Sequence, residues 1–284
     1  MMMLEKPSLL MAKLIFLYAT LISSLCFAQA REIAITLDDL PLIASRMNTA
    51  DNRQLAQERF TKLVNTLFQY KVPATGFVIA GSIQRGQWEF LKQFRQAGFA
   101  LGNHSYSHYN LNQIGAEEYI ADIDRADKML TKIMTTPKYF RYPYLAEGYT
   151  INKAKVQAYL NAHHYTIAPV TINSKDYDFN KRLYKIAEDE RESYATTLKA
   201  EYLAYIWNQT LKAEKRSKWP DNKQIILLHA NLLNSYLLAD VLEMYQKNGY
   251  KFISLGEALK HPAPPLAFPA LTNNIEIRRQ APSR

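Results

Sequence analysis

Two histidines, His104 and His108, stand four residues apart in the segment His-Ser-Tyr-Ser-His. This spacing brings two imidazoles to one side of a helical turn, where one carboxylate completes a His2Asp ligand set for a metal ion. Such a set leaves coordination positions open for water and substrate. Because two histidines at this spacing also occur by chance in loops, the spacing alone does not decide for a metal centre.

Two adjacent carboxylates, Asp38 and Asp39, end the first apolar run after residue 30. Their mutual repulsion is costly unless a cation or an arginine offsets it. One carboxylate of such a pair can bind a metal while its neighbour acts as a base. The alternative for an isolated Asp-Asp pair is a solvated turn or a helix cap. Together with the two histidines, the pair favours a metal centre.

Short β-rich runs alternate with helical patterns along the chain. The predicted strands are 32–37, 74–80, 100–102, 139–141, 165–172, 224–228 and 251–254, and the predicted helices are 53–70, 88–96, 116–133, 152–161, 235–247 and 257–260. Seven strands that alternate with helices predict an α/β fold, a distorted (β/α) barrel with about seven parallel strands. A doubly wound open sheet is the alternative, but no glycine-rich phosphate loop follows the first strand.

The titratable residues fall just after the predicted strands. In a parallel barrel the carboxyl ends of the strands meet at one face, where catalytic groups lie. Five segments are therefore expected to place side chains at one mouth: Asp38 and Asp39, His104 and His108, Arg141, Asp176, and His229.

Four of these segments resemble known motifs. The segments 36–39 (Thr-Leu-Asp-Asp), 104–108, 141–144 (Arg-Tyr-Pro-Tyr) and 227–229 (Leu-Leu-His) are similar to four of the five ordered motifs of the polysaccharide deacetylases, also called the NodB-homology domain or carbohydrate esterase family 4. The resemblance covers about Arg31 to Leu259. Each motif is short, but their order and their places at successive strand ends make the combination specific.

The resemblance implies a divalent metal, zinc first and Co²⁺, Ni²⁺ or Mn²⁺ as alternatives, held by Asp39, His104 and His108. Water activated by the cation would attack an acetamide carbonyl. The catalytic roles that the resemblance implies are the base for Asp38, the acid for His229, the partner of the base for Arg141 and the partner of the acid for Asp176.

The resemblance also implies substrate contacts. The backbone N–H of Tyr144, next to Pro143, would stabilise the oxyanion, and Leu227 would form the pocket for the acetyl methyl group. The fifth motif departs from the family pattern Asp-x-x-Asp-Trp, because Asn173 and Tyr177 stand where the first Asp and the Trp are expected. Tyr177 still offers an aromatic wall, though a smaller one, so the change bears on substrate shape more than on the reaction.

The chain is expected to have three parts. Residues 1–30 form an apolar leader that ends in Ala-Gln-Ala and is predicted to be a cleaved secretory signal. Either Met1 or Met11 is the start of the chain. Residues 31–260 form the catalytic domain, in which the charged stretch 181–218 is an inserted helical hairpin. Residues 261–284 are a proline-rich tail. The signal predicts a periplasmic or secreted protein without a stable membrane anchor.

A formal net charge of +9 favours anionic surfaces. Nucleic acid is not expected as a partner, because the charge is scattered and export removes that partner. The expected substrate is an N-acetylated glycan: peptidoglycan, which export and charge favour, a chitin-type oligomer or a surface polysaccharide. The alternatives are an O-acetyl esterase or a cyclic imide or amide hydrolase on the same fold, and a glycan-binding envelope protein without turnover. The oligomeric state stays open.

Overall fold

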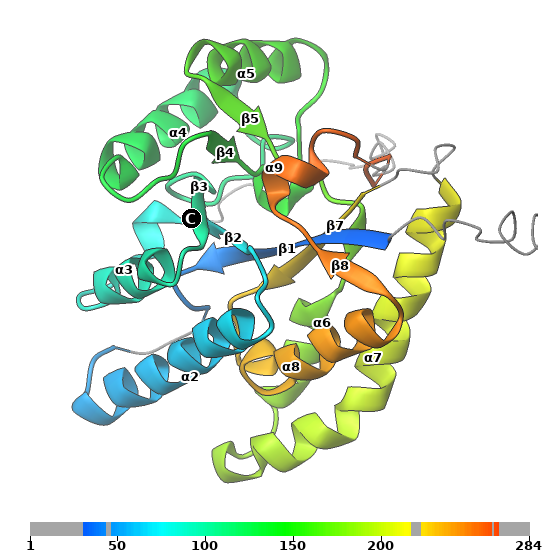
Figure 1. Ribbon diagram of the computed structural model, residues 1–284. Helices are drawn as coiled ribbons and strands as arrows, with labels where there is room; N and C mark the ends of the chain where they lie inside the picture. The colour runs from blue at the N-terminus through cyan, green and yellow to red at the C-terminus, as the bar shows by residue number, and fades with distance from the viewer. Residues whose placement is uncertain (1–30, 44–46, 217–222, 263, 267–284) are drawn as a thin grey trace, which may run out of the picture.

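The computed structural model describes residues 31–43, 47–216, 223–262 and 264–266. Within these residues, parallel strands form one curled sheet with helices around its outside (Figure 1). Neighbouring strands follow the order β5-β4-β3-β2-β1-β7-β6, and β8 pairs with the start of β1. The strand bounds are β1 Arg31–Leu40, β2 Thr75–Val78, β3 Ala100–Asn103, β4 Lys138–Phe140, β5 Tyr165–Ile167, β6 Ile172–Asn173, β7 Gln224–His229 and β8 Tyr250–Phe252.

The predicted strand over 165–172 is in fact two strands, β5 and β6, which lie at opposite ends of the sheet order. The four residues between them cross the gap: Ala168 N donates to Phe140 O (2.8 Å), and Thr171 N donates to Ile225 O (2.9 Å). Pro169 lies within this crossing and has no N–H to give to a strand ladder. A coil thus bridges the two ends of the half-barrel.

Strand β1 runs through the middle of the sheet and divides the core. Its side chains alternate with period two. Ile33, Ile35 and Leu37 join the large cluster under the helices, whereas Ala34 joins an inner cluster that includes Phe77. The same alternation puts Thr36 and Asp38 on the inner face. The polar residues at the end of the barrel therefore lie next to the small inner apolar cluster.

Except for the short last helix, whose Leu255 and Ala258 belong to the inner cluster, the helices cover the outer face of the sheet. Their bounds are α2 Ala50–Gln69, α3 Trp88–Gln96, α4 Ala116–Leu130, α5 Thr150–Ala162, α6 Asp176–Leu183, α7 Arg191–Arg216, α8 Leu232–Lys247 and α9 Leu255–Ala258, with short 3-10 turns η1 Ala80–Ser82, η2 Pro143–Leu145 and η3 Glu188–Glu190. Thr49 and Asn231 cap α2 and α8, because each side chain accepts a hydrogen bond from the first turn of its helix.

The predicted insertion over 181–218 is a pair of helices of unequal length. It comprises the end of α6 and all of α7, and its last two residues lie outside the described part of the chain. Buried side chains along α7, including Leu198, Tyr202 and Ile206, join the main core. The Tyr202 hydroxyl donates to Asn234 Oδ1 of α8 at 3.0 Å. Helix α7 is therefore part of the outer helical layer.

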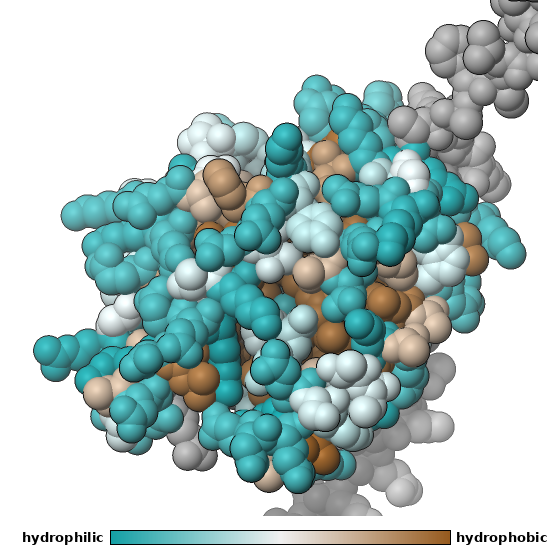
Figure 2. Space-filling model, turned by 60° about the horizontal axis from the view of Figure 1, so that its bottom comes forward, coloured by the Kyte–Doolittle hydropathy of each residue, from teal (hydrophilic) through white to brown (hydrophobic). Residues whose placement is uncertain are grey.

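The surface over the lower side of Figure 1 is mostly hydrophilic, and hydrophobic residues gather near its centre (Figure 2). Ion pairs link neighbouring helices there, such as Lys199 of α7 with Asp240 of α8 at 3.2 Å. No helix within the described residues combines the length and the apolar character needed to cross a membrane. The predicted signal, residues 1–30, lies outside the described part of the chain. The predicted fold, an α/β distorted barrel of parallel strands, is confirmed.

Candidate metal centre and active site

The predicted polar residues meet at the carboxyl ends of the strands. Asp38 and Asp39 lie near the end of β1, His104 follows β3 directly, and His229 is the last residue of β7. Register places Asp38 beside His229, because these two residues are partners in the β1–β7 ladder. The strand order therefore brings together groups that are up to 191 residues apart in sequence.

Asp39, His104 and His108 form a cluster that could hold a metal ion. One ligand atom from each of the three lies within 4.8 Å of the others. The Oδ1 atom of Asp39 lies 3.5 Å from His104 Nε2 and 3.3 Å from His108 Nε2. The two imidazole rings meet edge to face, with centroids 5.0 Å apart. One carboxylate and two imidazoles are a donor set that suits a divalent transition metal.

Two observations show that these residues fit a cation. Asp39 Oδ1 is a buried oxygen that makes no hydrogen bond within the described residues. A buried, unpaired carboxylate oxygen is costly unless a cation offsets its charge. In addition, His104 Nδ1 lies 2.7 Å from Arg141 O. A proton on Nδ1 makes that hydrogen bond, which leaves the Nε2 lone pair directed toward Asp39.

The Asp39 carboxylate is ionised in this environment. Burial by itself would raise the pKa of Asp39, but the imidazoles of His104 and His108 and the charge of His229 together hold the pKa well below its usual range. An ionised carboxylate is the form that binds metal.

The loop that carries the two histidines is held by a residue that the sequence analysis missed. Asp122 of α4 is buried, and its carboxylate accepts hydrogen bonds from Tyr106 N (2.9 Å) and Ser107 N (2.9 Å). Backbone φ is positive at Ser105 (63°) and His108 (56°), a region that L residues seldom adopt. The Asp122 contacts help to hold this strained loop.

Asp38 is paired with Arg141, as the resemblance implied. Arg141 is fully buried, and its Nη1 lies 3.1 Å from Asp38 Oδ1. The same Nη1 also donates to Thr36 Oγ1 at 3.2 Å. Asp38 Oδ2 faces the histidine cluster and lies 3.7 Å from His104 Nε2. One carboxylate oxygen is thus held by the guanidinium, and the other faces the metal ligands.

Arg141 also ties the active site to the coil that bridges the barrel. Its Nε donates to Ala168 O at 2.8 Å, and its Nη2 donates to Pro169 O at 3.4 Å. The guanidinium carbon lies 4.4 Å from the centre of the Phe77 ring in the inner cluster. Several fixed partners leave this guanidinium little freedom, which suits an orienting role.

His229, on the strand next to β1, is paired with Asp176 of α6. His229 Nδ1 lies 2.6 Å from Asp176 Oδ1, and His229 N donates to Asp176 Oδ2 at 2.7 Å. The side-chain amides of Asn231 (2.9 Å) and Asn234 (2.6 Å) donate to the same Oδ2. The fully buried carboxylate therefore has four hydrogen bonds. Neither asparagine was predicted from the sequence, although Asn231 stands at a helix start that favours capping residues.

Burial lowers the pKa of His229, but the charge and hydrogen bond of Asp176, with smaller contributions from Asp39 and Asp38, raise this pKa to about 9. The imidazole is therefore protonated at neutral pH. A protonated imidazole at the mouth of the barrel can donate a proton to a leaving group.

The residues predicted to contact substrate lie around the same mouth. Tyr144 is 62% exposed in η2 after the buried Pro143 and has φ 57°. Its ring is tilted against the His108 imidazole, with ring centroids 4.6 Å apart. Its N–H donates no hydrogen bond within the described residues. Leu227 is buried two residues before His229 in β7 and so shares its strand face.

The altered fifth motif forms part of the wall near His229. The Tyr177 ring meets the His229 imidazole edge to face, with centroids 5.8 Å apart. The Asn173 side chain accepts from Lys175 N at 2.9 Å in the turn that leads into α6. The turn is therefore intact with Asn at this position, and Asp176 keeps its contact with His229.

Comparison with known proteins identifies related sequences. The family model described as polysaccharide deacetylase matches residues 28–167, which include Asp38, Asp39, His104, His108 and Arg141. A peptidoglycan-N-acetylglucosamine deacetylase from Bacillus cereus is 29% identical over 114 residues, which are 40% of this chain and 36% of that protein. The chain thus matches about a third of the length of this relative.

A second peptidoglycan-N-acetylglucosamine deacetylase from Bacillus cereus is 27% identical over 233 residues, 81% of this chain and 88% of that protein. Among solved structures, the chitin deacetylase from Colletotrichum lindemuthianum superposes with a TM-score of 0.57 at 21% identity and covers 82% of this chain and 89% of that one. The structural likeness shows a shared fold. Together with the motif-bearing family match, these findings show that the chain belongs to the polysaccharide deacetylase family of enzymes.

Proposed function

We propose that this protein is an exported, metal-dependent hydrolase that removes N-acetyl groups from the amino sugars of a glycan. The observation that carries this proposal is the convergence of three sets at one mouth: the Asp39, His104 and His108 cluster, the Asp38–Arg141 pair and the His229–Asp176 pair. The named activities of the relatives support the same reaction class.

Asp39, His104 and His108 would hold the cation, with zinc as our first choice and cobalt, nickel or manganese as alternatives. When bound, the cation supplies a Lewis acid that lowers the pKa of a bound water and polarises the substrate carbonyl. The tautomer that the Arg141 carbonyl fixes at His104 keeps one ligand atom ready for the cation.

Asp38 would act as the base that takes the proton from the attacking water. Its Oδ1 is held by Arg141, so its Oδ2, which faces the metal ligands, is the oxygen free to accept that proton. The buried guanidinium fixes the orientation of the carboxylate. Asp38 is therefore ready as a base without further rearrangement.

His229 would act as the acid that protonates the leaving amine. Its Nδ1 is bonded to Asp176, so Nε2 is the atom left to give its proton at the mouth. The unpaired N–H of Tyr144 would stabilise the oxyanion from the other side, and Leu227 with Tyr177 would flank the acetyl group.

The same proposal extends to location and organisation. Residues 1–30 would direct export to the periplasm or beyond, residues 31–260 would form the catalytic domain with its helical insertion, and residues 261–284 would follow as a tail. The N-acetylated glycan is taken as peptidoglycan, a chitin-type oligomer or a surface polysaccharide.

Acetate release tests this function. Zinc-loaded protein from residue 31 onward would be incubated with acetylated chitooligosaccharides and with peptidoglycan, and released acetate and free amine would be measured together. We expect wild-type protein to release both, Asp38→Asn to retain zinc but lose activity at least about 100-fold, and His104→Ala to lose zinc and activity. Acetate without amine would instead indicate an O-acetyl esterase. An Asp38→Asn variant with undiminished turnover would contradict the proposed base.

A further inference from the structure

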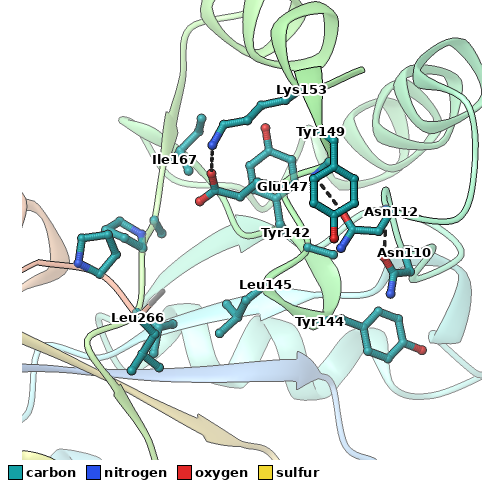
Figure 3. Close-up of a pocket in the computed structure, with 16 residues that line it drawn as sticks. Asn110, Asn112, Tyr142, Tyr144, Leu145, Glu147, Tyr149, Lys153, Ile167 and Leu266 are labelled. Carbon is teal, nitrogen blue, oxygen red and sulfur yellow. Dashed lines mark hydrogen bonds and ion pairs between the residues drawn. The ribbon is translucent and has the colours of Figure 1, made fainter. Parts of the chain in front are cut away.

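A cavity of about 560 Å³ lies next to the metal cluster. Tyr144 belongs to both, because it lines the cavity and its ring lies 4.6 Å from that of His108. Asn110, two residues after His108, lines the cavity as well (Figure 3). A glycan held at the mouth of the barrel could therefore place its neighbouring unit in this cavity.

The walls of the cavity combine flat apolar surfaces with hydrogen-bonding groups. The Tyr149 ring is 45% exposed at the start of α5, and Leu145 and Leu266 supply aliphatic surface (Figure 3). Asn112 Oδ1 accepts from Gly148 N at 3.1 Å, which leaves its amide hydrogens for a ligand. Sugar rings present apolar C–H faces and hydroxyl edges, so this mixture of surfaces suits a sugar ring.

The cavity carries no net charge. Among its described lining residues the ionised side chains are Glu147 and Lys153, and they are paired with each other at 2.6 Å (Figure 3). A carboxylate on an entering sugar would have to compete with Glu147 for the single ammonium group, whereas an uncharged sugar leaves the pair intact.

One wall comes from the far end of the described chain. Leu266 N donates to Val170 O at 2.9 Å, which places Pro265 and Leu266 over the coil that bridges the barrel. That coil also carries the carbonyls that Arg141 binds. The cavity is thus built from four separate segments, 110–112, 142–153, 167–170 and 265–266, which indicates a formed site with defined walls.

We propose that this cavity is a subsite for an uncharged N-acetylhexosamine unit next to the unit that is deacetylated, with the Tyr149 ring as its platform. The inference rests on the proposed deacetylase function. It selects a neutral amino-sugar polymer over a glycan whose neighbouring sugar carries a carboxylate.

Binding can be measured apart from turnover in the Asp38→Asn background. Calorimetry would compare tetraacetylchitotetraose with the peptide-free tetrasaccharide of alternating N-acetylglucosamine and N-acetylmuramic acid, which has the same length but carries carboxylates. We expect the neutral tetrasaccharide to bind more tightly, and Tyr149→Ala to weaken its binding about fivefold to tenfold. The control is Tyr184→Ala, another partly exposed tyrosine outside the cavity, which should change little.

Glu147 and Lys153 provide a matched pair of variants that tests the effect of charge in the cavity. Glu147→Gln frees the Lys153 ammonium and should strengthen binding of the carboxylate-bearing tetrasaccharide, whereas Lys153→Met should weaken it further. If Tyr149→Ala leaves binding unchanged, or if neither tetrasaccharide binds, the subsite is overturned. If wild-type protein releases acetate but Tyr149→Ala does not weaken binding, only the subsite is overturned. If Tyr149→Ala weakens binding but wild-type protein releases no acetate, only the deacetylase function is overturned.

Discussion

At the scale of single residues, each reactive side chain is held by a partner that leaves one atom free. Arg141 holds one oxygen of Asp38, the Arg141 carbonyl binds Nδ1 of His104, and Asp176 binds Nδ1 of His229. The remaining atoms, Asp38 Oδ2 and the two Nε2 nitrogens, are the ones that a reaction at the mouth would use. Preorganised groups of this kind need little rearrangement during the reaction.

The Asp176 carboxylate sets the pH range in which His229 is protonated. In Asp176→Asn the burial that lowers the pKa of His229 remains, while the largest of the charges that raise this pKa is lost. Since the acid acts when protonated, kcat for acetate release falls as pH rises through this pKa, and the alkaline limb should move to lower pH by about one unit or more.

The measurement is a pH profile of kcat at equal zinc loading, because a cation on Asp39 offsets part of the charge that acts on His229. Asp178→Asn is the control, since Asp178 is an exposed carboxylate that pairs with Lys181 at 3.6 Å. A limb that stays in place in Asp176→Asn would argue against His229 as the acid.

At the scale of elements, the strand ends and most helices could be predicted because each has its own apolar period. Helix α3 has the predicted bounds, 88–96. The run 165–172 misled because, apart from Pro169, its residues are compatible with a strand, and only the sheet order shows that its two ends pair with different neighbours. Local patterns do not contain that long-range information.

Asp122 illustrates what could have been found from sequence. It lies one residue before Ile123 and three after Tyr119, on the buried stripe of the helix predicted over 116–133. An acidic residue on the apolar face of a helix needs a partner, and that requirement is a usable signal. The identity of the partner, the backbone of the histidine loop, depends on tertiary structure and could not be predicted.

Asp122→Asn should weaken metal binding without removing a ligand. Both loop N–H groups donate to Oδ2, and Ser107 N also donates to Oδ1 at 3.1 Å. The amide removes the negative charge that strengthens these bonds and replaces one acceptor oxygen with an NH2 group, so the loop is held less firmly. We expect zinc affinity to fall about tenfold, measured by competition with a chromophoric chelator. Asp124→Asn, which removes an ion pair to Lys128 on the exposed side of the same helix, should leave zinc affinity unchanged.

At the scale of the whole molecule, the bridging coil 168–171 connects the fold to the site. It spans the two ends of the sheet, carries two carbonyls that bind Arg141, and supports the far wall of the neighbouring cavity. Stability and substrate contact therefore depend on the same short segment. This arrangement could not be predicted from sequence, since the apolar residues around Pro169 resemble a continuous strand.

Thr171 is the residue of this coil through which stability can be tested separately from chemistry. It is fully buried, and its hydroxyl accepts from Ile225 N at 2.8 Å and lies 2.7 Å from Gln224 Oε1. Thr171→Val keeps the shape but leaves a buried N–H without this partner, so the free energy of unfolding should fall by about 1–3 kcal/mol. Urea unfolding of the metal-free protein measures this change. The control is Thr66→Val, a partly exposed site on α2, which is expected within about 0.5 kcal/mol of wild type. Because Thr171 touches no reactive group, kcat of the folded variant should match that of wild type. If the free energy of unfolding is unchanged, the coil does not hold the two ends of the sheet together.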